Sequence, residues 1–134
     1  SWKNRKTYKG VFMIPIYRAF SETFDKYILG VPYFSDGRYY MLVDDCNKNN
    51  NIGSGSYPID ETTLSIHFPD MLDSKGNKIF ASLQEDGKGG DIMQDDEYFG
   101  IAKYKDCQFV VEYEDCIDNI DNGNFEVIGI QQWS

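Results

Sequence analysis

The sequence predicts a mainly β protein: a small antiparallel domain, SH3-like or barrel-like, with little helix. The 134 residues include ten Tyr and nine Phe, and rings of that size fit half-buried pleated strands. Turn signals recur about every ten residues between short apolar runs, and no long helical period is found. Because a chain of this length can bury a core of its own, we expect a single domain over residues 1–134.

The first part of the chain predicts two strands joined by a tight turn, preceded by a third. Residues 11–17 form a β-rich run that contains Pro15. Proline has no N–H for a strand ladder, which indicates an edge or a bulge at this point. Asp36-Gly37 separates the aromatic runs 27–34 and 38–43. Since tight hairpin turns need positive φ, Asp-Gly between two such runs favours a β-hairpin.

The rest of the sequence, from residue 44 onward, predicts more strands and two mobile loops. Residues 44–57 are polar and residues 84–90 are rich in glycine, so we expect mobile loops near both. The expected strands, in chain order, are 62–68, 98–104, 108–113 and 125–130, with a hairpin turn at Lys105-Asp106 and a tight turn at Asn122-Gly123.

Charge is strongly negative and unevenly distributed. Thirteen Lys and Arg stand against 22 Asp and Glu, a net charge of −9. Residues 1–20 hold five basic residues and no acid, whereas residues 85–121 hold twelve acids against three lysines. Such asymmetry is typical of solvated faces that keep a small domain soluble. The same asymmetry is expected if an acidic surface of the protein binds a basic partner or the basic end of another copy.

Cysteine usage and hydropathy bear on the compartment. Cys46, Cys107 and Cys116 are an odd set without CxxC spacing, which favours free thiols in a reducing compartment. A Cys107–Cys116 bridge stays an alternative if the two flank a hairpin. No apolar run approaches the roughly 20 residues that span a bilayer, so we expect no membrane association.

Few residues suggest catalysis or ligand binding. His67 is the single histidine and is expected to be a packing residue. No triad, metal spacing or phosphate loop is found, so we expect no catalytic residue, no metal and no cofactor. The acids of 112–121 fail the EF-hand frame, because Ile120 falls on the third ligand position. A weak divalent-ion site formed by these acids, or by the run Asp95-Asp96-Glu97, is the alternative to a solvated loop. Stacking of nucleic-acid bases is another alternative, through Tyr39, Tyr40, Tyr98 and Tyr104.

A polar turn followed by an apolar pair marks the middle of the chain. Asp73 is expected to accept backbone N–H groups of the turn, and Gly76 to supply positive φ. Ile79 and Phe80 are expected to point to opposite faces of a strand. The turn is followed by Gly90-Asp91-Ile92, whose acid can satisfy a loop amide. We interpret all of these residues as structural.

Further segments on both sides of this turn form an ordered series with it. The series consists of Tyr17, Arg18, Ala19, Phe20, Tyr27–Gly30, Tyr33–Leu42, Asp60–Thr63, Asp73, Gly76, Ile79, Phe80, Gly90, Asp91, Ile92, Gly100–Tyr104, Phe109, Glu126, Val127, Ile128 and Gly129. In this order, these segments resemble the YopX family of phage and prophage proteins. The matching segments cover most of residues 17–130, and the chain departs most from the family pattern where Ala81–Gly89 is inserted before Gly90.

The resemblance implies a protein of phage or prophage origin in the cytoplasm of a bacterial host, and it favours a homo-oligomer. We expect a non-enzymatic binding or assembly module. Two other hypotheses are an acidic mimic of nucleic acid that inhibits a basic host DNA-binding protein, and a single-stranded nucleic-acid binder. The net charge of −9 disfavours the second, because phosphate backbones need a basic surface.

Overall fold

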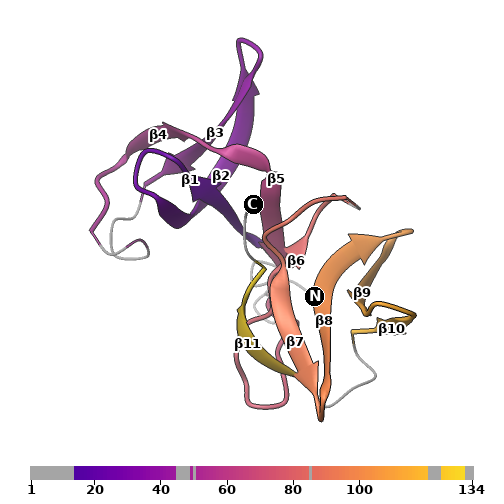
Figure 1. Ribbon diagram of the computed structural model, residues 1–134. Helices are drawn as coiled ribbons and strands as arrows, with labels where there is room; N and C mark the ends of the chain where they lie inside the picture. Colours follow the sequence, from indigo (N-terminus) through magenta and orange to yellow (C-terminus); the bar gives the residue numbers. More distant parts are fainter. Residues whose placement is uncertain (1–13, 45–48, 50, 85, 121–124, 132–134) are drawn as a thin grey trace, which may run out of the picture.

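The computed structural model describes residues 14–44, 49, 51–84, 86–120 and 125–131. These residues form strands joined by turns and loops, without an α-helix (Figure 1). Their strands are β1 (Ile16–Ser21), β2 (Lys26–Ser35), β3 (Arg38–Val43), β4 (Gly55–Pro58), β5 (Asp60–His67), β6 (Ala81–Ser82), β7 (Asp91–Asp95), β8 (Tyr98–Lys105), β9 (Gln108–Glu112), β10 (Ile117–Asn119) and β11 (Glu126–Ile130). None of the described residues belongs to a helix long and apolar enough to cross a membrane.

The strands form one mostly antiparallel sheet. Its order is β10-β9-β8-β6-β5-β1-β2-β3-β4, and β7 joins β8 to β11 off this path. Only the short contact between β6 and β8 is parallel among the described pairings. The mainly β, antiparallel class predicted from the sequence is confirmed. The sheet does not close, because β4 and β10 end the path and do not pair with each other.

The predicted hairpins form where turn residues interrupt the aromatic runs. Asp36 and Gly37 both have positive φ, 50° and 79°, between β2 and β3. The β8–β9 turn lies one residue later than predicted, because Lys105 still pairs with Gln108. Asp106 and Cys107 adopt positive φ there. The strand predicted at 125–130 is confirmed as β11, and the predicted Asn122-Gly123 turn lies outside the described residues.

The first of the two predicted loops contains secondary structure that its polarity did not suggest. Gly55–Pro58 forms β4 against β3, so the loop prediction is wrong there. Ahead of it, Asn49 is buried and its side-chain amide pairs with Leu29, accepting from the N–H at 2.6 Å and donating to the C=O at 2.8 Å. In the second loop, the Lys88 N–H donates to the Thr62 C=O at 2.7 Å. The mobility of both loops stays a prediction.

Two apolar clusters lie on either side of β5. The first is formed mainly by β1 to β3, where Met41 and Val43 are buried and the intervening Leu42 is exposed, as strand alternation requires. The second is formed by β6 to β11 and the segment before β6, and contains Met93, Ala102 and Phe125. β5 pairs with β1 on one edge and with β6 on the other, so it connects the two lobes seen in Figure 1.

Candidate functional site

A groove of about 590 Å³ lies beside the β7–β8 turn and the connection from β9 to β10, and we term it the acidic groove. Its lining residues are acids, rings and one thiol. They are Asp95, Glu97, Tyr98, Phe99, Tyr113, Glu114, Asp115, Cys116 and Asp118.

Short turns position the walls of the acidic groove. Asp95 pairs with Tyr98 to end the β7–β8 ladder, and Asp96 takes positive φ of 55° in the turn between them. On the other wall the Tyr113 N–H donates to the Cys116 C=O at 2.8 Å. Gly100 lets the walls approach, because a Cβ there would lie 3.1 Å from Tyr113 Cδ1 and 2.6 Å from Val111 Cγ1.

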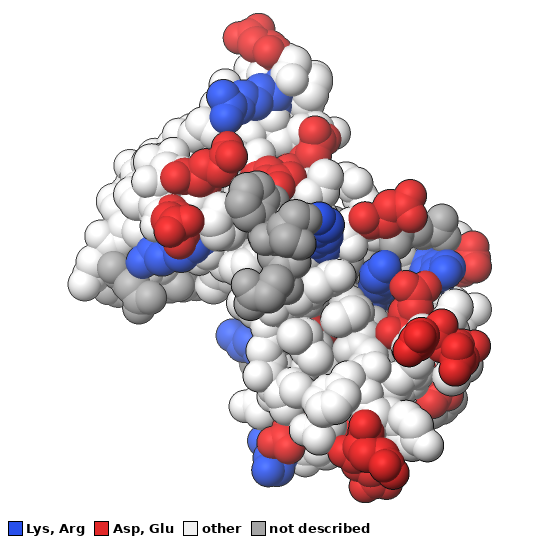
Figure 2. Space-filling model, viewed as in Figure 1, with Lys and Arg blue, Asp and Glu red and all other residues white. Residues whose placement is uncertain are grey.

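The acidic groove concentrates negative charge. Five carboxylates line it, no Lys or Arg does, and none of these five acids belongs to an ion pair between described residues. Lys103 and Lys105, on the neighbouring strand, both pair with Glu112. Figure 2 shows acidic side chains gathered over the lobe of β8 to β10. Burial, together with the charges of Asp95 and Asp118, raises the pKa of Tyr113 to about 12.

Exposed rings accompany these carboxylates. Tyr98 and Phe99 are 66% and 55% exposed, respectively. Large rings left open to water next to a groove are typical of contact surfaces, since burying them on a partner removes apolar area from water. The groove therefore offers an apolar contact and a field that attracts positive charge.

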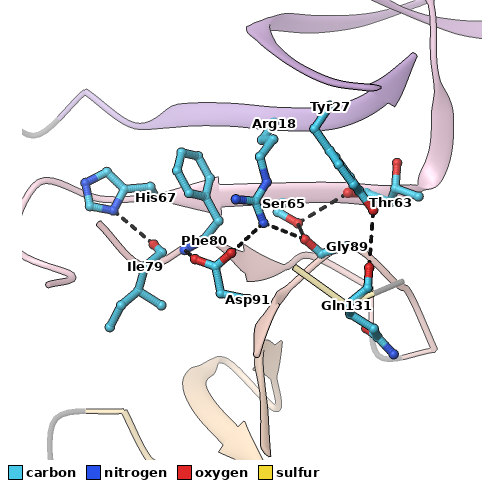
Figure 3. Close-up of polar contacts among 10 residues, drawn as sticks. All are labelled: Arg18, Tyr27, Thr63, Ser65, His67, Ile79, Phe80, Gly89, Asp91 and Gln131. Atoms are coloured by element: carbon cyan, nitrogen blue, oxygen red, sulfur yellow. Dashed lines mark hydrogen bonds and ion pairs between the residues drawn. The ribbon is translucent and has the colours of Figure 1, made fainter. Parts of the chain in front are cut away.

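A second notable cluster lies between the two lobes, where a buried ion pair joins β1 to β7 (Figure 3). Arg18 Nη2 donates to Asp91 Oδ1 at 2.8 Å and to the Gly89 C=O at 2.7 Å. Asp91 Oδ2 accepts the Phe80 N–H at 2.8 Å, and the guanidinium carbon lies 4.4 Å from the centre of the Phe80 ring. The Arg18 and Asp91 side chains are only 10% and 2% exposed.

Burial dominates the electrostatics of this junction. It raises the pKa of Asp91, although the charge of Arg18 and the Phe80 N–H lower it. The Gly89 C=O also accepts from Ser65 Oγ at 2.9 Å, which ties the loop to β5. Gly89 has φ of 91°, and a Cβ there would lie 2.4 Å from the Thr63 C=O oxygen. The cluster is closed to substrate and holds the lobes together, which is a structural role.

Asp73 organises a second buried connection. Its Oδ1 accepts the N–H groups of Lys75 and Asn77 at 2.9 and 2.7 Å, as the turn prediction required. Its Oδ2 accepts the Val127 N–H of β11 at 2.9 Å. Gly76 has the predicted positive φ, 83°. The turn therefore holds the C-terminal strand as well as itself.

The other motif residues surround these two connections. Ile79 belongs to the second apolar cluster and Phe80 contacts Arg18, but both precede β6 and do not lie in a strand, which corrects the strand prediction. A Cβ at Gly90 would lie 2.2 Å from the Ala102 C=O oxygen, so close approach explains this glycine. The remaining motif residues lie in β1, β7 and β11, where Ile128 is exposed: Tyr17, Ile92, Val127, Ile128 and Gly129.

The sequence shows the acids of the groove as two separate runs, but it did not predict that both runs line one groove. It placed Asp95, Asp96 and Glu97 in one acidic run and the acids of 112–121 in another, and it did not single out Phe99. The available signal was that each run lies at the end of a predicted hairpin. Among the described residues, no three His, Cys, Asp or Glu side chains come together as ligands for a metal ion. Cys107 and Cys116 are free and exposed, so the alternative of a bridge between them is wrong.

His67 is buried between the lobes and predicts a pH-dependent stability. Its Nδ1 donates to the Ile79 C=O at 2.9 Å, which requires a proton on Nδ1. Burial lowers the pKa of His67 from 6.5; the Ile79 C=O, Asp91 and Asp70 oppose this, and Lys78 adds to it. Protonation therefore favours the unfolded chain, so the free energy of unfolding should fall as pH drops below about 6.5.

Because His67 is the single histidine, proton NMR titration of its ring measures this pKa directly. Urea unfolding of the protein and of His67→Gln at several pH values supplies the second measurement. The variant should lack the loss of stability between pH 6.5 and 5. A His67 pKa at or above 6.5 would contradict this prediction.

Comparison of the chain with protein-family models, with curated proteins and with solved structures finds no match in any of the three. Membership of the YopX family accordingly stays a prediction. The structural features above stand independently of it.

Proposed function

We propose that this protein is a non-enzymatic binding module whose acidic groove takes a positively charged protein partner. The observation that supports it most directly is the meeting of five carboxylates and two exposed rings on one groove. A basic side chain is attracted by the field, and its apolar stem or a neighbouring ring can cover Tyr98 and Phe99. Phosphate backbones are repelled by the same field, so a nucleic acid is a poor ligand for this groove.

A binding role without catalysis is supported by where the titratable groups lie. His67 is 2% exposed and its Nδ1 is committed to the Ile79 C=O. Asp91 is 2% exposed and paired with Arg18. Neither group is presented to solvent where a substrate could meet it.

The resemblance to the YopX family supports a bacterial cytoplasm and a phage or prophage origin for this role. It also supports a self-associating protein. The hypothesis of an acidic nucleic-acid mimic is a narrower form of the same proposal, in which the partner is a basic host DNA-binding protein. For such a partner, double-stranded DNA should displace this protein.

Neutralising the groove should weaken binding of a fluorescent lysine-rich peptide that contains one Trp. The triple variant Asp95→Asn, Asp115→Asn, Asp118→Asn removes three of the five charges, and we expect a loss of about tenfold or more in affinity, or about 1.4 kcal/mol. The dependence of affinity on salt should become shallower. Fluorescence anisotropy over a range of salt concentrations measures both quantities.

The matched control removes three exposed acids of the other lobe: Glu22→Gln, Asp25→Asn and Asp36→Asn. Asn is well tolerated at the positive φ of Asp25 and Asp36. The control should change affinity by less than about twofold, since these charges lie in the β1–β2 and β2–β3 turns of the other lobe. Equal losses in both variants would mean that only overall charge matters, and the proposal would be wrong.

A further inference from the structure

We infer that the acidic groove is occupied, in the free protein, by the basic N-terminal segment of the same chain, residues 1–13. This segment would act as an internal competitor that a partner has to displace. The inference rests on the proposed function and names how the same groove is regulated.

Charge complementarity identifies the occupant. Residues 1–13 contain Lys3, Arg5, Lys6 and Lys9 and no acid. The groove is lined by five acids and by no basic residue. In a chain of net charge −9, residues 1–13 are the densest run of positive charge, which makes them complementary to a groove lined by five acids.

The segment also supplies apolar groups that match the groove. Trp2, Tyr8 and Phe12 alternate with the basic residues in the sequence. Tyr98 and Phe99 present their exposed rings at the groove. Rings with interspersed basic groups can cover these rings and approach the carboxylates at the same time, including by cation–π contact.

The tether is long enough to reach. A chain of 13 residues extends to about 45 Å. A compact domain of this size has a radius of gyration of about 14 Å, so its surface is about 36 Å across. Residue 14 lies just ahead of β1, whose first residue pairs with His67 between the lobes. Most of the surface, including the β7–β8 end, is therefore within the reach of the segment.

Tethering favours this occupant over a second copy. A short tether gives an effective concentration of order millimolar, whereas a second copy is present at the protein concentration, commonly micromolar. If both arrangements make the same contacts, the groove is therefore filled more often by the segment of its own chain than by that of a second copy. The intramolecular arrangement needs no second copy at the groove, whereas the alternative arrangement makes a dimer that depends on residues 1–13.

The probe is a fluorescent peptide with the sequence of residues 1–13, titrated with three full-length proteins. The N-terminal variant carries Lys3→Gln, Arg5→Gln, Lys6→Gln and Lys9→Gln. The control carries Lys26→Gln, Arg38→Gln, Lys75→Gln and Lys78→Gln, and so has the same net charge. We expect the N-terminal variant to bind the peptide about tenfold more tightly than wild type, because the internal competitor is weakened. The control should bind like wild type.

Equal affinity of wild type and N-terminal variant would overturn the inference, and so would an equal gain in the control. A wild-type mass of two chains by light scattering, lost in the N-terminal variant, would instead assign the groove to a second copy. Failure of the proposed function looks different. In that case the peptide binds none of the proteins, or it binds the triple groove variant as tightly as the parent.

Discussion

Replacing Arg18 by Met is expected to lower the free energy of unfolding by about 3–5 kcal/mol, the largest loss for any single change considered for this protein. The change leaves the Asp91 carboxylate, which is 2% exposed, without its cation. It also removes the contact between the guanidinium and the Phe80 ring. Urea unfolding followed by circular dichroism measures the loss.

A second substitution tests the cause. Asp91→Asn, added to Arg18→Met, removes the buried charge but keeps an oxygen for the Phe80 N–H. The double variant should therefore recover more than about half of the lost stability. If it is instead less stable than Arg18→Met, the unpaired charge is not the cause of the loss.

The pH dependence of the single variant provides an independent measurement. Burial already raises the pKa of Asp91 while Arg18 is present. Without Arg18 the pKa of this carboxyl should rise further, so the folded state binds a proton more readily than the unfolded chain does. The stability difference between wild type and Arg18→Met should then shrink from pH 7 to pH 5. A constant difference would contradict this account of Asp91.

Replacing Asp73 is expected to produce the second largest loss, about 2–4 kcal/mol for Asp73→Ala. This carboxylate accepts three backbone N–H groups and the side-chain amide of Asn77. The variant leaves the Val127 N–H without its acceptor. Hydrogen exchange should show that β11 loses protection before β8 or β9 does.

Asp73→Asn distinguishes hydrogen-bond acceptance from turn preference. Asn favours turns about as well as Asp, but one of its two polar atoms is a donor. That donor would face the Val127 N–H or the turn amides, so we expect a loss of at least about 1.5 kcal/mol. Asp70→Asn, at an exposed acid nearby, should change stability by less than about 0.5 kcal/mol. Full tolerance of Asn at position 73 would mean that turn preference alone matters.

The pKa of Asp73 adds a pH signature. Burial raises this pKa, but the hydrogen bonds from Val127, Asn77 and Lys75 outweigh burial and lower it below the ordinary value of 3.8. The corresponding stability is present above that value and lost as pH falls through the lower folded pKa. Asp73→Ala should therefore unfold with a shallower acid dependence than the protein itself.

Local chemistry made several features predictable. Asp36-Gly37 determines a tight turn by its φ preference, and the turn forms as predicted. The Asp73 turn and the class of the fold followed from side-chain type and from the alternation of apolar runs. Polarity misled at 55–57, because pairing with β3 fixes backbone that carries little apolar surface.

By itself, the sequence determined a mainly β chain with its principal hairpins, a turn at Asp73 and a strong charge asymmetry, because these depend on neighbouring residues. Only the tertiary structure decided that Arg18 and Asp91, 73 positions apart, share a buried ion pair. It alone brought the acids of two hairpin ends and two exposed rings into one groove. The physical reason is strand pairing between distant segments: β1 pairs with β5, β5 with β6 and β6 with β8, and no local pattern encodes these registers.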